Sequence, residues 1–235
     1  MPFNAWNSWR QMAGGTKARD RGKLRACQHA LQPQQSIFIT QVANFMPFSE
    51  SSMLSAIVGF LEARQPKSIL DVGIGFGQYG FLARTNLEHL NLFEWDDHGA
   101  RKRTREEWLI KIDGIEAFPD YITPVSEYCY NTIYKGDALD VLPTITDKYE
   151  MILAIEILEH FSKEDGLRFL ELLKGLASKS VLISTPKIFI EQNYPANPYE
   201  NHRSFWTQEE LRGLGFSEFL DNPDCWIASF SHDPG

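Results

Sequence analysis

Cysteine is scarce in this chain, which has only Cys27, Cys129 and Cys225 in 235 residues. Their wide spacing matches neither a disulfide framework nor the paired spacing of a zinc site. Reduced thiols and a cytoplasmic location are therefore expected. The first nine residues lack the charged and then apolar regions of a secretory signal peptide. No apolar run approaches the ~18 residues that a membrane span needs, so no membrane partner is expected.

An excess of positive charge is also missing. The chain carries 23 Lys and Arg against 31 Asp and Glu, for a formal net charge of −8. Because phosphate backbones are bound by basic faces, this balance disfavours a nucleic acid as partner. Basic residues cluster in residues 1–35, with a net charge of +5, and again in 101–105. Each cluster is either a solvated surface or a binding site for an anionic substrate. We expect a basic N-terminal arm over residues 1–48 and one domain over 49–235.

Strand and helix patterns alternate along that domain, after a helix over Met53–Ala63 that starts near Ser49. The predicted strands are Ser68–Val72, Leu109–Ile115, Thr132–Tyr134, Tyr149–Ile155, Ser180–Ser184, Phe216–Leu220 and Cys225–Phe230. The predicted helices are Gln78–Leu92, Pro119–Tyr130, Lys163–Ala177 and Thr207–Leu214, and residues 93–108 form an insertion. This order predicts an α/β fold with a Rossmann-like, seven-stranded, mostly parallel sheet and helices on both faces.

The first of these strands ends in an acid and a glycine turn, Asp71-Val72-Gly73-Ile74-Gly75-Phe76-Gly77. Glycine lets a backbone turn sharply and lie close to a ligand, and a strand–turn–helix junction forms a nucleotide-sized pocket. A dinucleotide site is one interpretation, because Gly75, Gly77 and Gly80 match G-x-G-x-x-G. That fingerprint should begin at the glycine directly after the strand, which is Gly73. Its third glycine would then fall on Gln78, which disfavours the dinucleotide interpretation.

The letters Asp-Val-Gly-x-Gly-x-Gly resemble the first motif of class I S-adenosylmethionine (SAM) methyltransferases. The resemblance covers about Ser68 to Phe230 and implies an antiparallel final strand in the sheet. It also implies that Asp71, Gly73, Gly75 and Gly77 bind SAM.

Acidic residues recur at the ends of the next predicted strands. Glu116 follows the second strand and is preferred to Asp113 as the residue that accepts hydrogen bonds from both ribose hydroxyls. By the same resemblance, Asp137 and Ala138 contact the adenine, and Glu156 contacts the cofactor after the fourth strand.

The segment after the fourth strand reads Glu156-Ile157-Leu158-Glu159-His160. It resembles the pattern of ubiquinone-biosynthesis O-methyltransferases and of small-RNA 3′-end 2′-O-methyltransferases. The resemblance implies a divalent metal, which would lower the pKa of a bound hydroxyl, held by Glu156, Glu159, His160 and His202. In the metal-free alternative, Glu159 caps a helix and His160 is a general base. His160 and His202 are the catalytic candidates in either case.

The segment from the fifth predicted strand to Trp206 is expected to line the acceptor pocket. Its aromatic residues suit a planar or sugar-like small molecule, although simple packing on the sheet explains them equally well. They are Phe189, Tyr194, Tyr199, Phe205 and Trp206. Because none of the three cysteines sits at a strand end of the expected pocket, a catalytic cysteine is not expected.

These patterns predict a SAM-dependent methyltransferase that acts on an oxygen or nitrogen of a small molecule. Three alternatives stay open. They are a nucleic-acid or protein methyltransferase that uses the basic arm, a non-catalytic SAM- or nucleotide-binding subunit, and a nicotinamide-dependent oxidoreductase. The sequence also leaves a homo-oligomer open.

Overall fold

The structure, a computed structural model, describes residues 49, 51–88 and 92–232. These residues belong to one compact unit, Pro47–Gly235. The basic arm expected over residues 1–48 lies wholly outside the described residues. Within the described ranges, no helix has the length and apolar character needed to cross a membrane.

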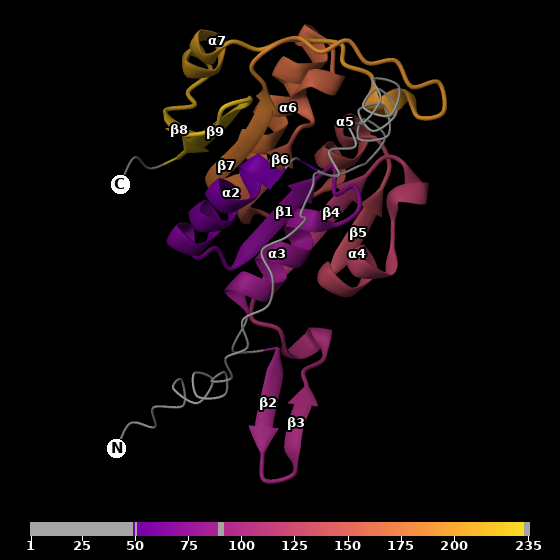
Figure 1. Ribbon diagram of the computed structural model, residues 1–235, viewed down its shortest axis with the longest axis vertical. Helices are drawn as coiled ribbons and strands as arrows, with labels where there is room; N and C mark the ends of the chain where they lie inside the picture. The colour runs from indigo at the N-terminus through magenta and orange to yellow at the C-terminus, as the bar shows by residue number, and fades with distance from the viewer. Residues whose placement is uncertain (1–48, 50, 89–91, 233–235) are drawn as a thin grey trace, which may run out of the picture. The chain divides into compact units, whose positions relative to one another are not determined.

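A seven-stranded sheet of order β5-β4-β1-β6-β7-β9-β8 forms the centre of the unit (Figure 1). Its strands are β1 Ser68–Val72, β4 Lys111–Glu116, β5 Thr132–Lys135, β6 Tyr149–Ile155, β7 Ala177–Pro186, β8 Glu218–Leu220 and β9 Cys225–Ser231. Neighbours from β5 to β7 are parallel, and β9 is antiparallel to both β7 and β8. The predicted Rossmann-like sheet with an antiparallel final strand is confirmed.

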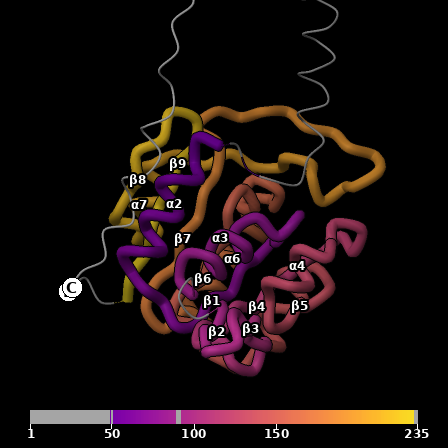
Figure 2. Tube along the Cα trace, turned by 60° about the horizontal axis from the view of Figure 1, so that its bottom comes forward, coloured from indigo at the N-terminus to yellow at the C-terminus, as the bar shows by residue number. Residues whose placement is uncertain are grey.

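Helices cover both faces of this sheet (Figures 1 and 2). The bounds are α2 Ser51–Arg64, α3 Gln78–Leu87, α4 Pro124–Cys129, α5 Ala138–Val141, α6 Lys163–Leu176 and α7 Gln208–Gly213. Buried side chains of α2, α3 and α4 pack with one set of strand residues, and those of α5, α6 and α7 pack with the other. Along β6, Met151 and Leu153 join the first cluster while Ile152 and Ala154 join the second. This alternation follows from the two-residue period of a strand.

The helix predicted over Pro119–Tyr130 is wrong. The chain forms a 3-10 turn, η3 (Pro119–Tyr121), and then α4. Pro124 disfavours helical backbone at the residue before it. Thr123 is accordingly extended, and its hydroxyl accepts a hydrogen bond from Ser126 N as the cap of α4.

The insertion at residues 93–108 contains a separate two-stranded antiparallel sheet of β2 (Phe93–Asp96) and β3 (Gly99–Lys102). All eight strand residues are exposed, and Trp95 is 78% exposed. Helix α3 ends at Leu87, earlier than the predicted Leu92.

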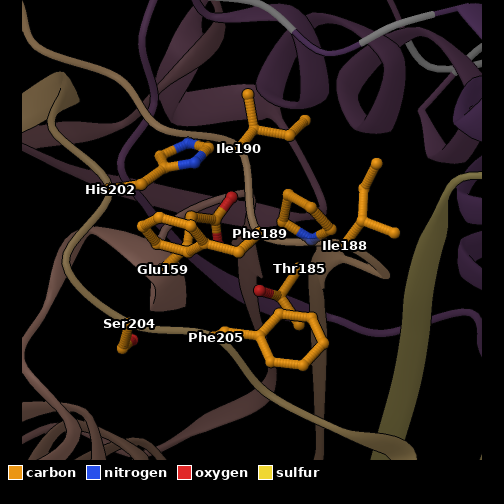
Figure 3. Close-up of a pocket in the computed structure, with 9 residues that line it drawn as sticks. Glu159, Thr185, Ile188, Phe189, Ile190, His202, Ser204 and Phe205 are labelled. Carbon is orange, nitrogen blue, oxygen red and sulfur yellow. The ribbon is translucent and has the colours of Figure 1, made fainter.

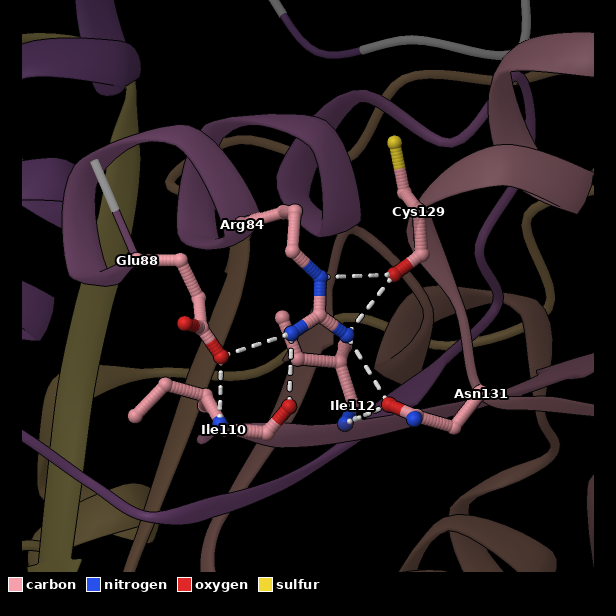
Figure 4. A network of polar contacts seen from close by, with 6 residues as sticks. All are labelled: Arg84, Glu88, Ile110, Ile112, Cys129 and Asn131. Atoms are coloured by element: carbon pink, nitrogen blue, oxygen red, sulfur yellow. Dashed lines mark hydrogen bonds and ion pairs between the residues drawn. The ribbon is translucent and has the colours of Figure 1, made fainter. Parts of the chain in front are cut away.

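A buried arginine connects α3 to the neighbouring segments (Figure 4). Arg84 donates hydrogen bonds to the carbonyl oxygens of Cys129 and Ile110 and to Asn131 Oδ1. Its Nη1 lies 3.3 Å from Glu88 Oε1, and both side chains are fully buried. Burial lowers the pKa of Arg84 to about 10, so the guanidinium stays charged at neutral pH. The network fixes the positions of α3, β4 and α4 relative to one another.

Candidate functional site

A glycine loop joins β1 to α3 at the carboxyl edge of the parallel strands. Gly73, Gly75 and Gly77 have φ angles of 77°, 49° and 94°, a region that residues with a Cβ rarely adopt. A Cβ at Gly73 would lie 2.0 Å from Cδ1 of Ile157. The glycine therefore allows the loop to contact the segment that follows β6.

Replacing Gly73 with alanine is expected to lower the free energy of unfolding by about 3 kcal/mol, because the new methyl group overlaps Ile157 and the positive φ is strained. Urea denaturation followed by circular dichroism measures the change. Gly59→Ala is the matched control. Nothing lies within 4 Å of its Cβ position in α2, so a gain of about 0.5–1 kcal/mol is expected. Equal effects of the two substitutions would contradict the role of the contact.

Asp71 lies beneath this loop and is 2% exposed. Tyr130 Oη donates a hydrogen bond of 2.5 Å to Asp71 Oδ2 and accepts one from Gly80 N. Burial raises the pKa of Asp71 to about 7, although the tyrosine hydroxyl opposes the shift. The side chain thus fixes β1 to the start of α3, and its part in SAM binding stays a prediction.

Glu116 is at the tip of β4, and its carboxylate is hydrogen-bonded to the glycine loop. Oε2 accepts from Gly75 N and Oε1 from Phe118 N, each at 2.8 Å. The backbone N–H of Ala117 is hydrogen-bonded to the same carboxylate, which still leaves acceptor capacity for a ribose hydroxyl. Asp113, the other candidate, lies inside the strand, where it accepts from Tyr149 Oη at 2.6 Å. The strand register therefore places Glu116, and not Asp113, at the carboxyl edge.

Asp137 follows β5 at the same edge. Its Oδ1 accepts a hydrogen bond of 2.9 Å from Leu139 N and so caps α5. Ala138, the first residue of that helix, is buried. The predicted adenine contact is compatible with this position and stays a prediction.

Three predicted metal ligands come together beyond the end of β6. Glu159 and His160 belong to the 3-10 turn η5 (Leu158–His160), whereas His202 lies on the segment between β7 and α7. One ligand atom from each side chain lies within 4.8 Å of the others. The carbonyl oxygen of Glu159 accepts from Arg203 N at 2.8 Å and Ser204 N at 3.1 Å. These two bonds hold His202 beside η5.

Burial sets the protonation of this group. It lowers the pKa of His160 to about 4, with help from the nearby His202, and it lowers the pKa of His202 as well. Both imidazoles are therefore neutral at pH 7, as metal ligation requires. Burial also raises the pKa of Glu159 to about 8. Its Oε2 has no hydrogen-bond partner within the described part of the chain. Glu159 is therefore protonated at pH 7, and a metal would displace its proton on binding. Two neutral imidazoles and an unpartnered carboxyl oxygen then fit a divalent transition metal.

The fourth predicted ligand, Glu156, lies outside this group. Its Oε1 accepts a hydrogen bond from Cys225 Sγ at 3.8 Å. The expectation that no cysteine sits at the end of a strand in the pocket is wrong. Because β9 is antiparallel, its first residue, Cys225, lies at the edge where the parallel strands end.

A shallow hollow adjoins the group (Figure 3). Glu159, Thr185 and His202 line its polar side, and the Thr185 hydroxyl is hydrogen-bonded to Glu159. The apolar lining is Pro186, Ile188, Phe189, Ile190 and Phe205. Phe189 and Phe205 thus occupy the expected acceptor region.

Trp206 differs from these aromatic residues. It is 1% exposed and packs against Gly166 of α6, where a Cβ would lie 2.6 Å from its ring. Its Nε1 donates to Ser204 Oγ at 2.8 Å. Trp206 therefore anchors the acceptor segment in the core and does not line the hollow.

The arrangement of the sheet and its helices is similar to that of known proteins. Solved structures similar to the chain include DhpI in complex with S-adenosylhomocysteine (SAH), with a TM-score of 0.56 and 12% sequence identity over 83% of this chain and 91% of DhpI. Another is the magnesium protoporphyrin IX methyltransferase ChlM of Synechocystis PCC 6803 with bound SAH, with a TM-score of 0.52 and 12% identity over 84% of this chain and 95% of ChlM. The chain has the class I methyltransferase fold. No protein-family model matches the sequence, and no curated protein does.

Within this methyltransferase fold, the sequence motifs missed two polar residues near the site. Tyr121 on η3 and Glu200 on η6 (Pro198–Glu200) share a hydrogen bond. Neither belongs to a motif, and they lie on different segments of the chain. Only the path of the segment between β7 and α7 brings them together.

Proposed function

We propose that the chain is a SAM-dependent methyltransferase that transfers the methyl group to an oxygen or nitrogen of a small molecule. One contact carries the proposal. Ile157 packs directly on Gly73, and it is followed within three residues by Glu159 and His160. The loop that would hold the methyl donor therefore touches the segment that would hold the acceptor. Holding two reactants in one orientation is a large part of catalysis for a direct transfer.

The acidic surroundings support a small molecule over a nucleic acid. Asp71, Glu116 and Glu159 are all buried at this edge of the sheet, and Glu200 is half-buried beside them. The edge therefore offers no positive charge of its own from these residues, and the formal net charge of −8 disfavours a phosphate backbone. The name of the similar ChlM, a magnesium protoporphyrin IX methyltransferase, agrees with a small acceptor.

The protonation of His160 favours a ligand role over a base role. A pKa of about 4 makes the imidazole a weak base near pH 7, where a general base works best with a pKa near the ambient pH. Glu159, His160 and His202 would hold the metal. When bound, a divalent metal would lower the pKa of a coordinated hydroxyl of the acceptor. The apolar residues of the hollow would then exclude water from the acceptor.

Calorimetric titration of the full chain with SAM, SAH and NAD tests the proposal. We expect dissociation constants in the micromolar range for SAM and SAH and no binding of NAD. Each titration is repeated with EDTA and with Mn²⁺ to separate the metal from the cofactor. NAD binding without SAM binding would overturn the proposal in favour of an oxidoreductase. A folded protein that binds none of the three would also overturn it.

A further inference from the structure

The hairpin of β2 and β3 lies at the edge of the sheet opposite the candidate site. It is inserted between the end of α3 at Leu87 and the start of β4 at Lys111, whereas the site lies where the parallel strands end. Figure 1 shows the hairpin extending beyond the other strands and helices. A two-stranded hairpin is at best marginally stable in water without a further element that packs on one of its faces.

The strand register gives the hairpin an aromatic face. Directly opposite residues of an antiparallel pair lie on the same face, so Phe93 and Lys102 share a face with Trp95 and Ala100. The domain meets this face at its base, where Lys102 Nζ lies 4.3 Å from the centre of the Tyr128 ring. Towards the turn the face is open, because Trp95 is 78% exposed and Phe93 48%.

The opposite face of the hairpin is polar, and its charges are paired. Glu94 and Arg101 lie opposite each other and form an ion pair. Arg101 also donates hydrogen bonds of 3.0 and 2.8 Å to the two carboxylate oxygens of Glu107. Because this face has its partners, an association of the hairpin is expected at the aromatic face.

The two ends of the hairpin carry opposite charges. The tip, residues 96–99, contains Asp96 and Asp97 and no lysine or arginine. The base, residues 102–106, contains four charged residues, three of which are basic: Lys102, Arg103, Arg105 and Glu106. Within the described chain, none of these side chains at the tip or the base forms an ion pair. An acidic tip and a basic base are complementary to a second hairpin that runs in the opposite direction.

The strand edges disfavour pairing of two hairpins edge to edge. Glu94 and Asp96 make β2 acidic, whereas Arg101 and Lys102 make β3 basic. Two-fold pairing of β2 with β2, or of β3 with β3, would place like charges together. Pairing of β2 with β3 of the next copy is heterologous and would continue into an open assembly. A closed pair therefore forms through the faces.

We propose that the aromatic face of the hairpin is an interface at which a second copy of this chain binds with the same face. The two hairpins run in opposite directions about a two-fold axis, so that Trp95 of each copy lies over Phe93 of the other. The acidic tip of each copy then meets the basic base of the other. The parallel arrangement would instead bring the two acidic tips together.

The size of this contact determines its strength. Aromatic side chains bury about 150–250 Å² each, so the four that meet bury at most about 1,000 Å². Such an area belongs to weak interfaces, and the dimer is expected to depend on protein concentration. Because the hairpin and the site lie at opposite edges of the sheet, the dimer is independent of the proposed function.

Sedimentation velocity of the full chain, at concentrations from about 1 to 100 µM, tests the dimer. We expect a monomer–dimer equilibrium with a dissociation constant in the micromolar range. Trp95→Ser is expected to weaken the dimer by about tenfold or more, since it removes the largest side chain of the face. Leu167→Ser replaces an exposed apolar residue of α6 and is the matched control, which should leave the equilibrium unchanged. Circular dichroism verifies that each variant is folded.

Exchanging the charges of the tip and the base is a second, independent test. Asp97→Lys is expected to weaken the dimer several-fold, because the new lysine faces the basic base of the other copy. Lys102→Glu should weaken it in the same way. The double variant again has opposite charges at the two ends, so it should regain most of the lost affinity.

Other outcomes overturn the proposal. A chain that stays monomeric over the whole concentration range has no such interface. A dimer that Trp95→Ser leaves intact uses another surface, and assemblies that grow beyond the dimer indicate pairing at the strand edges. A double charge variant that dimerises no better than the single variants contradicts the antiparallel arrangement. The affinity for SAM should be the same in the wild type and Trp95→Ser, which separates this test from that of the proposed function.

Discussion

Replacing Arg84 with methionine is expected to lower the free energy of unfolding by about 3–5 kcal/mol, because the substitution leaves a buried carboxylate without its counter-charge. Glu88 is fully buried, and its Oε2 already lacks a hydrogen-bond partner among the described residues. The carbonyl oxygens of Cys129 and Ile110 would lose their donors as well. Small domains are stable by only about 5–15 kcal/mol, so the loss would be a large part of the total.

Urea denaturation of two arginine variants measures this effect. Arg64 forms an ion pair of 2.6 Å with Glu218, but the two side chains are 46% and 43% exposed. Arg64→Met is therefore expected to cost less than about 1 kcal/mol. Adding Glu88→Leu to Arg84→Met should recover part of the stability, since no charge then stays buried. A cost for Arg84→Met no larger than that for Arg64→Met would contradict the interpretation of the network.

Replacing His160 or His202 with alanine is expected to weaken Mn²⁺ binding by about 100-fold or more, since even residues behind the ligands contribute 10–100-fold to metal affinity. Both rings are neutral and lie 5.1 Å apart between centroids. The affinity for SAM should change little, because neither ring contacts the glycine loop through a described hydrogen bond. Calorimetric titration with Mn²⁺ and then with SAM measures the two effects separately.

The exposed His98 of the hairpin provides the control. His98→Ala should leave Mn²⁺ binding unchanged. Unaltered Mn²⁺ binding in both site variants would remove the metal from the proposal. A loss of methyl transfer without any metal effect would instead support His160 as a general base.

Buried strands with clear boundaries could be predicted from the sequence. The predicted ends of β1 and β6 are those of the structure, because an apolar run buried on both faces is bounded by polar and turn-forming residues. The capping box of Thr207 and Glu210 at the start of α7 is also confirmed. The hairpin of β2 and β3 was missed, since the alternation of Phe93 and Trp95 with acidic residues covers only four residues and β3 has no matching apolar alternation.

The site was only partly predictable for a different reason. Glu159 and His160 are close in sequence and lie at a strand end, so their proximity follows from the order of the elements. Cys225, Tyr121 and Glu200 come from three other segments. Their meeting depends on the direction of β9 and on the path of residues 187–206 between β7 and α7, which no local pattern encodes.

The burial of Trp206 has a consequence for how a ligand enters. This side chain is part of the core at the end of residues 187–206, the segment between β7 and α7, so that end moves only when the packing against α6 opens. In the middle of the segment, Asn197 Nδ2 donates a hydrogen bond of 3.0 Å to Tyr121 Oη, and this attachment breaks far more easily. Loss of the Asn197 attachment would leave residues 187–206 held at β7 and at Trp206. His202, close to Trp206, would then keep its place beside η5.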